Sequence, residues 1–217
     1  MRILITAGPT REYLDDVRYL SNASSGRMGY ALAAAALAAG HEVVLISGPV
    51  ALTPPDGVEL LPVETTEELL QACSEAWSTC DGVIATAAVC DYRPRARFPG
   101  KIAKTGVSLE LELVETADVL AELGRLKGQR WIIGFALESE EFAHVNALRK
   151  LKHKNCDAIV LNRPTAIGAT DNSVELIDGQ GTTVARYTGT KQVVADELIS
   201  WIGKQMGISR KSEQSGA

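Results

Sequence analysis

The chain has 217 residues, of which 46% are hydrophobic and 23% charged, and its formal net charge is −5. This composition is that of a globular protein with one sizeable core, and it gives no reason to expect nucleic acid or an anionic membrane as a partner. The 4 cysteines form no C-x-x-C pair and no histidine lies at ligand spacing from them, so neither a zinc site nor a disulfide framework is indicated.

The N-terminal part of the sequence argues against export. Residues Met1–Gly8 lack the apolar stretch of a signal peptide, and the apolar run Tyr30–Ala39 is far shorter than the ~20 residues of a membrane span. Together with cysteines that we expect to be reduced, these features predict a cytoplasmic protein without a membrane anchor.

Short apolar segments alternate with helical patterns along most of the chain. The expected strands are Arg2–Thr6, Glu42–Ile46, Glu59–Val63, Gly82–Val89, Trp131–Leu137 and Asp157–Leu161. The expected helices are Gly26–Ala39, Thr66–Trp77, Asp118–Leu126 and Glu141–Lys154, and a long polar loop precedes the first of them. Continuous apolar strands that alternate with helices are typical of a mostly parallel sheet covered by helices on both faces.

The C-terminal part has a different pattern. Val174–Ile177 and Thr182–Tyr187 flank the turn Asp178–Gly181, which predicts a β-hairpin at one edge of the sheet, and a closing helix from Thr190 to about Met206 follows. The remaining residues are small and polar. We therefore predict an α/β fold with a single Rossmann-like domain over residues 1–206 and a disordered tail over 207–217.

The run Asn22-Ala-Ser-Ser-Gly-Arg-Met-Gly29 is the first candidate for binding chemistry. In such sheets ligands collect beyond the carboxyl ends of the strands, near the point where the strand order reverses. Ser24, Ser25 and Gly26 stand at the N-terminus of the alanine-rich helix, where free N–H groups attract phosphate oxygens. The alternative is a helix cap with two packing glycines, which leaves the length of the preceding loop unexplained.

Four further features carry weaker signals. Asp91, after the small residues Ala87 and Ala88, could accept from a hydroxyl or hold a metal, but a lone Asp there is more often a turn residue. Lys101 lies on a loop from which it could reach a transferring phosphoryl group. Phe135 ends a strand and could pack against a base or simply fill the core. Lys150 and Lys154 share a helix face because they are four residues apart.

Other enzyme classes find less support. The sequence has neither a G-x-G-x-x-G fingerprint nor a Walker A motif, and no histidine stands in a catalytic-triad context. Tyr187 and Lys191 match the Y-x-x-x-K spacing of short-chain dehydrogenases, but Gly189 interrupts the helix that this motif requires. A nicotinamide-dependent oxidoreductase and a non-catalytic nucleotide-binding domain stay as alternatives, since fold alone does not decide function.

Taken together, these motifs resemble the phosphopantothenate–cysteine ligase family of coenzyme A biosynthesis. The matching residues are Ile5–Glu12, Asp16–Arg18, Ser21–Gly29, Ala87–Tyr92, Lys101-Ile102, Gly134-Phe135, Lys154–Asp157, Asn162 and Asp171-Asn172. They occur in the family's order and extend over essentially the chain through the final helix. The sequence departs from the family's pattern at three positions. Asp16 takes the place of the proline in the family's usual Asp-Pro, Cys90 stands where Ala is common, and Ala103 stands where a second lysine is usual.

The resemblance implies an enzyme that joins 4′-phosphopantothenate to cysteine. Bacterial members use CTP to form an acyl-cytidylate with release of pyrophosphate, and the cysteine amine then displaces CMP. Mg²⁺ is expected, held mainly by the triphosphate. No flavin is expected, because nothing here resembles the flavin-dependent decarboxylase that precedes this domain in many bacteria. Members are homodimers with shared active sites, and the Val174–Tyr187 hairpin is a candidate dimer edge. Whether the chain is a free-standing synthetase or part of a bifunctional protein stays open.

The resemblance also implies a role for individual residues. Asn22 would orient the acyl-phosphate intermediate, and Lys101 would stabilise the α-phosphate. The implied nucleotide-binding residues are Ala85, Thr86, Ala87, Asp91, Lys101, Ala117, Asp118, Val119, Leu120, Phe135, Lys150 and Lys154. The residues expected at the phosphate or substrate are Gly8, Thr10, Asn22, Ser24, Ser25, Gly26, Met28, Gly29 and Ala88. Which phosphate the Ser24–Gly29 turn holds stays open.

Overall fold

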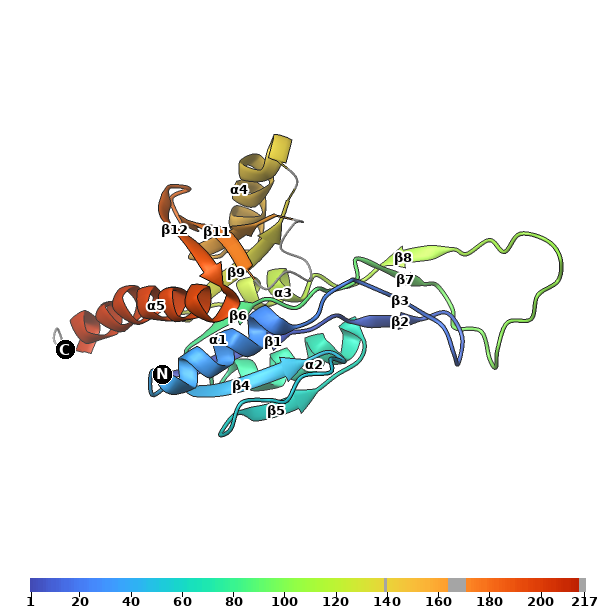
Figure 1. The fold of residues 1–217 in the computed structure, drawn as a ribbon, viewed down its shortest axis with the longest axis horizontal. Coiled ribbons are helices and arrows are strands. Elements are labelled where there is room, and N and C mark those ends of the chain that lie inside the picture. Colours follow the sequence, from blue (N-terminus) through green and yellow to red (C-terminus); the bar gives the residue numbers. More distant parts are fainter. Residues whose placement is uncertain (139, 164–170, 215–217) are drawn as a thin grey trace.

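An eight-stranded sheet forms the centre of the computed structural model, which describes residues 1–138, 140–163 and 171–214 (Figure 1). From edge to edge the strands are β12 (Thr183–Thr190), β11 (Asp171–Asp178), β10 (Ala158–Asn162), β9 (Trp131–Leu137), β6 (Gly82–Ala85), β1 (Arg2–Ala7), β4 (Glu42–Ser47) and β5 (Glu59–Pro62). The six strands from β10 to β5 are parallel, and β11 and β12 are antiparallel additions. This confirms the predicted α/β fold class with a C-terminal hairpin at the edge.

The order of the strands fixes where a ligand can bind. From β1 the chain first adds β4 and β5 on one side and then crosses over to add β6, β9 and β10 on the other. The topological switch point therefore lies between β1 and β6. At such a point the connections leave the two strands in opposite directions and open a crevice beyond their carboxyl ends.

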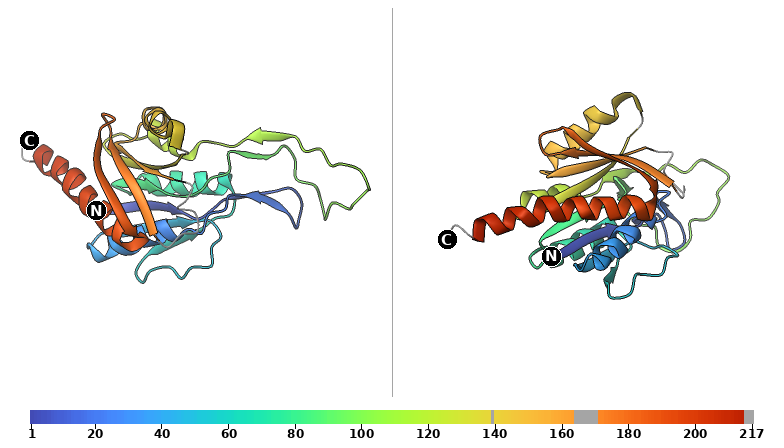
Figure 2. Two further views of the ribbon diagram at one scale, coloured as in Figure 1. Left: turned by 45° about the horizontal axis from the view of Figure 1, so that its top comes forward. Right: turned by 60° about the vertical axis from the view of Figure 1, so that its left-hand side comes forward.

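Helices cover both faces of the sheet (Figures 1 and 2). One face carries α1 (Arg27–Ala38) and α5 (Lys191–Gln214), and the other carries α2 (Thr66–Trp77), α3 (Val119–Arg125) and α4 (Ala143–His153), the last preceded by a short 3₁₀ turn, η1 (Glu140–Phe142). Successive residues of a strand point to opposite faces. Accordingly Ile3 and Ile5 of β1 pack with α1, whereas Leu4 packs against the α2 side, and all three are fully buried.

The predicted strand Gly82–Val89 is too long, because the ladder ends at Ala85. Beyond that point the chain continues alongside the end of β1 in an irregular conformation. Thr86 donates both its N–H and its hydroxyl to the carbonyl oxygen of Thr6, at 3.1 and 2.6 Å, and Ala88 donates its N–H to Gly8 at 2.9 Å. The apolar run Thr86–Val89 thus belongs to the wall of the crevice rather than to the sheet.

The polar stretch between β1 and α1 is not simply a loop, as the sequence predicted. It forms a hairpin of β2 (Arg11–Tyr13) and β3 (Tyr19–Ser21), and a second pair, β7 (Tyr92–Pro94) and β8 (Leu113–Glu115), projects beside it from the same end of the sheet (Figure 1). We call residues 92–115 the arm and residues 14–18 the hairpin tip.

The C-terminal elements are longer than predicted. Both strands of the β11–β12 hairpin extend beyond their expected ends, and α5 continues past Met206 to Gln214. Residues 215–217 of the predicted tail lie outside the described residues, so the domain boundary at residue 206 stays a prediction. Within the described ranges, no helix combines the length and the apolar character that a membrane span requires.

Candidate functional site

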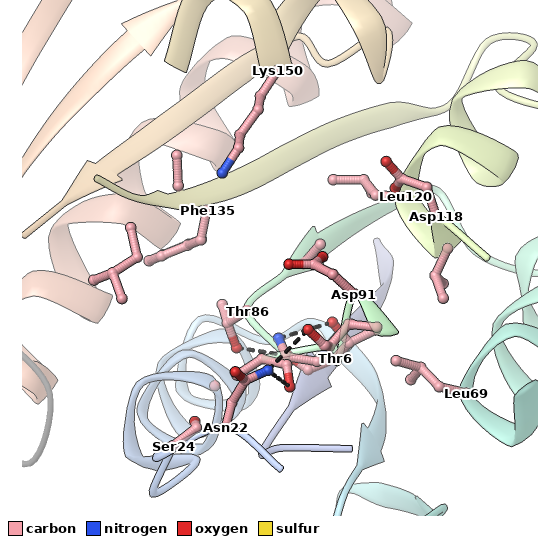
Figure 3. Close-up of a pocket in the computed structure, with 18 of the residues that line it drawn as sticks. Thr6, Asn22, Ser24, Leu69, Thr86, Asp91, Asp118, Leu120, Phe135 and Lys150 are labelled. Atoms are coloured by element: carbon pink, nitrogen blue, oxygen red, sulfur yellow. Dashed lines mark hydrogen bonds between the residues drawn. The ribbon is translucent and has the colours of Figure 1, made fainter. Parts of the chain in front are cut away.

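A cleft of about 1130 Å³ opens at the switch point, beyond the carboxyl ends of β1, β6 and β9 (Figure 3). Most of the residues that the sequence predicted for the site line it. These are Asn22, Ser24, Ser25, Gly26, Met28, Gly29, Ala85, Thr86, Ala87, Ala88, Asp91, Ala117, Asp118, Val119, Leu120, Phe135, Lys150 and Lys154. The cleft is large enough for a small-molecule ligand, and its position is the one expected for a doubly wound sheet.

The N-terminus of α1 forms one wall of the cleft. Gly26, the residue before the helix, has a left-handed backbone conformation with φ of 73°, and no side chain caps the helix. Ser24 instead accepts a long hydrogen bond of 3.4 Å from the N–H of Gly26. The first turn of α1 therefore lacks the side-chain acceptor that usually satisfies its N–H groups, and it presents them beside the cleft. This arrangement suits an anion.

Two of the predicted phosphate-binding glycines also have a role in the fold. A Cβ atom at Gly29 would lie 2.5 Å from Cβ of Ala7 and 2.6 Å from the Thr86 hydroxyl oxygen, so only glycine lets α1 approach β1 and the residue after β6 this closely. Gly8 has φ of +72°, and a Cβ there would lie 2.9 Å from the carbonyl oxygen of Gly48. Packing and ligand binding are thus compatible explanations of Gly29, whereas Gly8 does not line the cleft.

Asn22 lies on the floor of the cleft with its amide fixed. The side-chain nitrogen donates to the carbonyl oxygens of Ala88 at 3.0 Å and Val89 at 2.9 Å (Figure 3). If the amide were flipped, its oxygen would face two carbonyl oxygens, so these hydrogen bonds determine which terminal atom is the nitrogen and which is the oxygen. Because both amide hydrogens have protein acceptors, the side-chain oxygen is the group that Asn22 can offer to a ligand, and it can only accept.

Charged pairs form the opposite wall. Lys150 lies 2.7 Å from Glu138, and Lys154 lies 2.9 Å from Asp118. Asp118 also accepts from the N–H of Ala121 at 3.1 Å and so caps α3. Burial is the largest single influence on Asp118 and raises its pKa, but the hydrogen bond and the charge of Lys154, together with the N–H of Ala121, outweigh burial and hold the pKa below its usual value. Both lysines are therefore ion-paired, and they line the same cleft from one side of the helix, as the four-residue spacing predicted.

Between the N-terminus of α1 and the lysine wall, part of the lining is apolar. Phe135 from β9, Leu120 from α3 and Leu69 from α2 face the interior (Figure 3), and the small residue Ala87 also lines the cleft. The N–H of Ala87 donates to the Thr6 hydroxyl at 3.2 Å and is not available to a ligand. This surface can take an aromatic base or an aliphatic chain through contact rather than through hydrogen bonds.

Three predicted residues are not brought to the cleft: Gly8, Thr10 and Lys101. Thr10 is 1% exposed, and its hydroxyl oxygen accepts from the N–H of Cys90 at 2.8 Å and bonds to the Thr66 hydroxyl at 3.2 Å, so it serves the fold. Lys101 lies exposed in the loop of the arm. Within one copy of the chain, the two residues predicted to be catalytic, Asn22 and Lys101, are not part of one cleft.

Sequence reasoning missed several polar residues that line the cleft, among them Arg27, Glu115, Glu138, Arg149, His153 and Lys191. A signal existed for two of them. Glu138 directly follows a predicted strand, where ligand-facing residues gather, and His153 lies three residues after Lys150 on the same helix face. The described residues contain no group of three or more His, Cys, Asp or Glu side chains that could hold a metal ion. Asp91 and Glu115 line the cleft as separate carboxylates.

The fold and the cleft define an open α/β domain whose switch-point cleft is suited to an anionic ligand. The family described as "DNA/pantothenate metabolism flavoprotein C-terminal domain" matches residues 1–206. The chain belongs to this family, which confirms the family resemblance stated from the motifs.

Named relatives agree with this assignment. The coenzyme A biosynthesis bifunctional protein CoaBC of Bacillus subtilis (strain 168) is 45% identical over 168 residues, which cover 77% of this chain and 41% of that protein. A cysteine/cysteine sulfinic acid decarboxylase from an unknown prokaryotic organism is 41% identical over 204 residues, covering 91% of this chain and 56% of that protein. The chain thus spans about half the length of these relatives. The crystal structure of the C-terminal domain of CoaBC is similar, with a TM-score of 0.80, 39% identity and 95% coverage of both chains.

Proposed function

We propose that this domain is a phosphopantothenate–cysteine ligase that uses CTP. A carboxylate oxygen of 4′-phosphopantothenate attacks the α-phosphorus of CTP, and pyrophosphate leaves. The cysteine amine then attacks the acyl carbon, CMP leaves, and the nitrogen loses a proton.

The observation that carries the proposal is the cleft that is lined both by the uncapped N-terminus of α1 and by Lys150 and Lys154, in a chain of this family. The decarboxylase activity named for one relative belongs to a protein of which the chain covers only 56%.

The charged walls supply anion binding. The free N–H groups of α1 suit a phosphate group, and the two lysines can exchange their carboxylate partners for phosphate oxygens. Phe135 and Leu120 then pack against the base or the pantothenate chain. Mg²⁺ would be held mainly by the triphosphate, and Asp91 or Glu115 of the cleft lining could add a carboxylate, since magnesium typically takes one or two carboxylates together with substrate phosphates.

Asn22 is suited to the second half-reaction. Its amide hydrogens are occupied by Ala88 and Val89, which leaves its oxygen as an acceptor. That oxygen can accept a hydrogen bond from the cysteine amine and so aim the nitrogen lone pair at the acyl carbon. Positioning of this kind contributes to rate without a strong side-chain base.

Lys101 needs a second copy of the chain to act. The arm projects beyond the end of the sheet (Figures 1 and 2), and Lys101 does not line the cleft of its own chain. We propose that the arm reaches the cleft of a partner copy in a homodimer, where Lys101 stabilises the α-phosphate. The arm carries the exposed apolar side chains Val107 (78% exposed) and Leu109 (53% exposed), which suit burial against a partner. The β11–β12 edge predicted from sequence offers less apolar surface, since Val184 is its one large exposed hydrophobic residue among the described positions.

Pyrophosphate release tests the proposal. The purified domain should release pyrophosphate when 4′-phosphopantothenate and cysteine are present, with a higher rate for CTP than for ATP. No release with either nucleotide would reject the ligase. Binding of CTP without release would favour the non-catalytic nucleotide-binding domain, and a thermal shift with NAD(P) but none with CTP would favour the oxidoreductase. A protein without flavin absorbance would agree with the expectation that this chain carries no flavin.

A further inference from the structure

The hairpin tip and the arm are joined by a buried carboxylate. Asp15 is 0% exposed, although it lies in a hairpin that projects from the sheet. One carboxylate oxygen accepts from the N–H groups of Val17 at 2.8 Å and Arg18 at 2.7 Å, which closes the turn of the hairpin. The other accepts from Nε of Arg18 at 2.9 Å and, across 87 residues of sequence, from the N–H of Ile102 at 3.1 Å.

Arg18 completes the connection to the arm. Its guanidinium is held by Asp15 and donates from Nη2 to the carbonyl oxygen of Ile102 at 2.7 Å. Both backbone groups of Ile102 are thereby bound to the hairpin tip, one by the carboxylate and one by the guanidinium. The residue that follows Lys101 is fixed by an ion pair rather than by the local conformation of its own loop.

Asp16 holds the other side of Lys101. Its side chain accepts from the N–H of Gly100 at 2.9 Å and from Arg97 at 2.8 Å, and its own N–H donates to the Gly100 carbonyl at 3.1 Å. Gly100 and Ile102 are therefore both anchored to adjacent residues of the hairpin tip. Lys101 is the one residue between these two anchors, and its side chain is exposed.

The placement of this carboxylate argues for more than turn formation. Removing a carboxylate from water is unfavourable unless hydrogen bonds replace its hydration. Burial would raise the pKa of Asp15, but the hydrogen bonds from Val17, the Arg18 side chain and Ile102 outweigh it and lower the pKa. The hairpin turn uses only one of the two oxygens, and the second oxygen is given entirely to Arg18 and Ile102.

We propose that Asp15 is a positioning residue for Lys101. Together with Arg18 it fixes the backbone of Ile102, while Asp16 fixes the backbone of Gly100. The backbone of Lys101 is thereby held in one conformation, and its side chain starts from one defined position. The inference rests on the proposed role of Lys101 in catalysis. A misplacement of a catalytic group by about 1 Å can lower a rate on the order of 100-fold, so a clamp of this kind is sufficient to control turnover.

The test compares Asp15→Asn with Glu112→Gln, a matched change on the arm. Glu112 pairs with Arg95 at 2.7 Å, both side chains are more than 60% exposed, and the pair is not part of the Asp15–Arg18–Ile102 connection. In pyrophosphate release, Asp15→Asn should lower kcat about 10-fold or more with the KM for CTP changed less than about threefold, and Glu112→Gln should match the unmodified chain. Equal kcat in Asp15→Asn and Glu112→Gln would overturn the proposal.

A double variant separates positioning from general stability. If Asp15 acts through Lys101, Asp15→Asn should cause no further loss in a Lys101→Gln background, because the group that it positions is already gone. A multiplicative loss in the double variant would mean that Asp15 acts on something else and would overturn the proposal. Where Asp15→Asn does not fold, Asp16→Asn, which changes an exposed side chain, gives the same comparison for the Gly100 anchor.

Hydrogen exchange distinguishes failure of this inference from failure of the proposed function. Amide exchange of the peptide covering residues 97–104 should be faster in Asp15→Asn than in Glu112→Gln, whether or not the protein releases pyrophosphate. Unchanged exchange would overturn the clamp itself. Faster exchange with no pyrophosphate release from the unmodified chain would reject the ligase and with it the positioning role, while leaving the hairpin–arm connection established.

Discussion

Asn22 donates its side-chain amide to the carbonyl oxygen of Ala88 at 3.0 Å, and so connects the loop before α1 to the segment after β6 across the switch point. A second bond to Val89 at 2.9 Å uses the other amide hydrogen. The two acceptors give Asn22 a single orientation before any ligand binds. A polar group that is held in this way needs no reorganisation when the reaction begins.

Replacement of Asn22 by Asp should therefore disable the enzyme without unfolding it. The carboxylate would face two carbonyl oxygens, turn away from them and lose its orientation. We expect kcat to fall about 100-fold or more, with a melting temperature within a few degrees of the original because residue 22 is exposed. Gln180→Glu is the matched control, since it makes the same chemical change in the β11–β12 turn. Similar losses in the two variants would remove Asn22 from the site.

Mixing two inactive variants tests whether the arm completes a partner's cleft. Lys101→Gln alone should lose most turnover and keep its fold, whereas Lys104→Gln, on the same loop, should lose much less. If each cleft takes Lys101 from the partner, a mixed dimer of Lys101→Gln and Asn22→Asp contains one intact site. Random exchange of subunits should then restore about a quarter of the original activity. No recovery after exchange, checked by a mass label on one variant, would place both residues in the same copy's site.

Gly29 offers a prediction about the fold beneath the cleft. A methyl group there would meet Ala7 at 2.5 Å, and this neighbour cannot move because it belongs to the central strand β1. Gly29→Ala should destabilise the protein by about 2 kcal/mol or more in urea unfolding. Gly203 in α5 is the control, because nothing lies within 4 Å of a Cβ at that position. Gly203→Ala should instead stabilise by about 0.5–1 kcal/mol, and an unfolding midpoint unchanged in Gly29→Ala would contradict the close packing.

The sheet could be predicted because its signal is local. The residues of β1 are apolar on both faces, as a central parallel strand requires, and Thr65 caps α2 by accepting from the N–H of Glu68. The two projecting strand pairs could not be predicted in this way. Each of their strands has 3 residues, and the contacts that hold them, such as Asp15 with Ile102, join segments 87 residues apart. No pattern within a short window records such a contact.

The candidate site, like the fold, could be predicted only where the signal in the sequence is local. The residues after the strand ends were found because the topology of a doubly wound sheet assigns ligands to that edge. The partners of the two lysines were not found, since Lys154 meets Asp118 across 36 residues and no pattern in the sequence pairs Glu138 with Lys150. Lys101 was assigned to the site because it occurs in a motif of the family. In one copy of the chain it lies on the arm and not in the cleft. The order of motifs in a sequence does not distinguish a residue's own cleft from that of a partner copy.

The buried Asp15 also predicts how stability depends on pH. Its hydrogen bonds outweigh the effect of burial and lower its pKa in the folded protein, whereas in the unfolded chain it titrates near the usual value of about 3.9. The carboxylate therefore contributes stability that is fully present above that unfolded pKa and is lost progressively as the pH falls below it, toward the lower pKa of the folded protein.

The amide that Asp15→Asn introduces does not titrate, so the difference in urea midpoint between the original chain and this variant should be constant from about pH 7 to 5. It should then shrink below about pH 4. Glu112→Gln, which alters an exposed pair, should show no comparable convergence. A difference that stayed constant down to about pH 3 would show that the charge of Asp15 does not stabilise the connection between the hairpin tip and the arm.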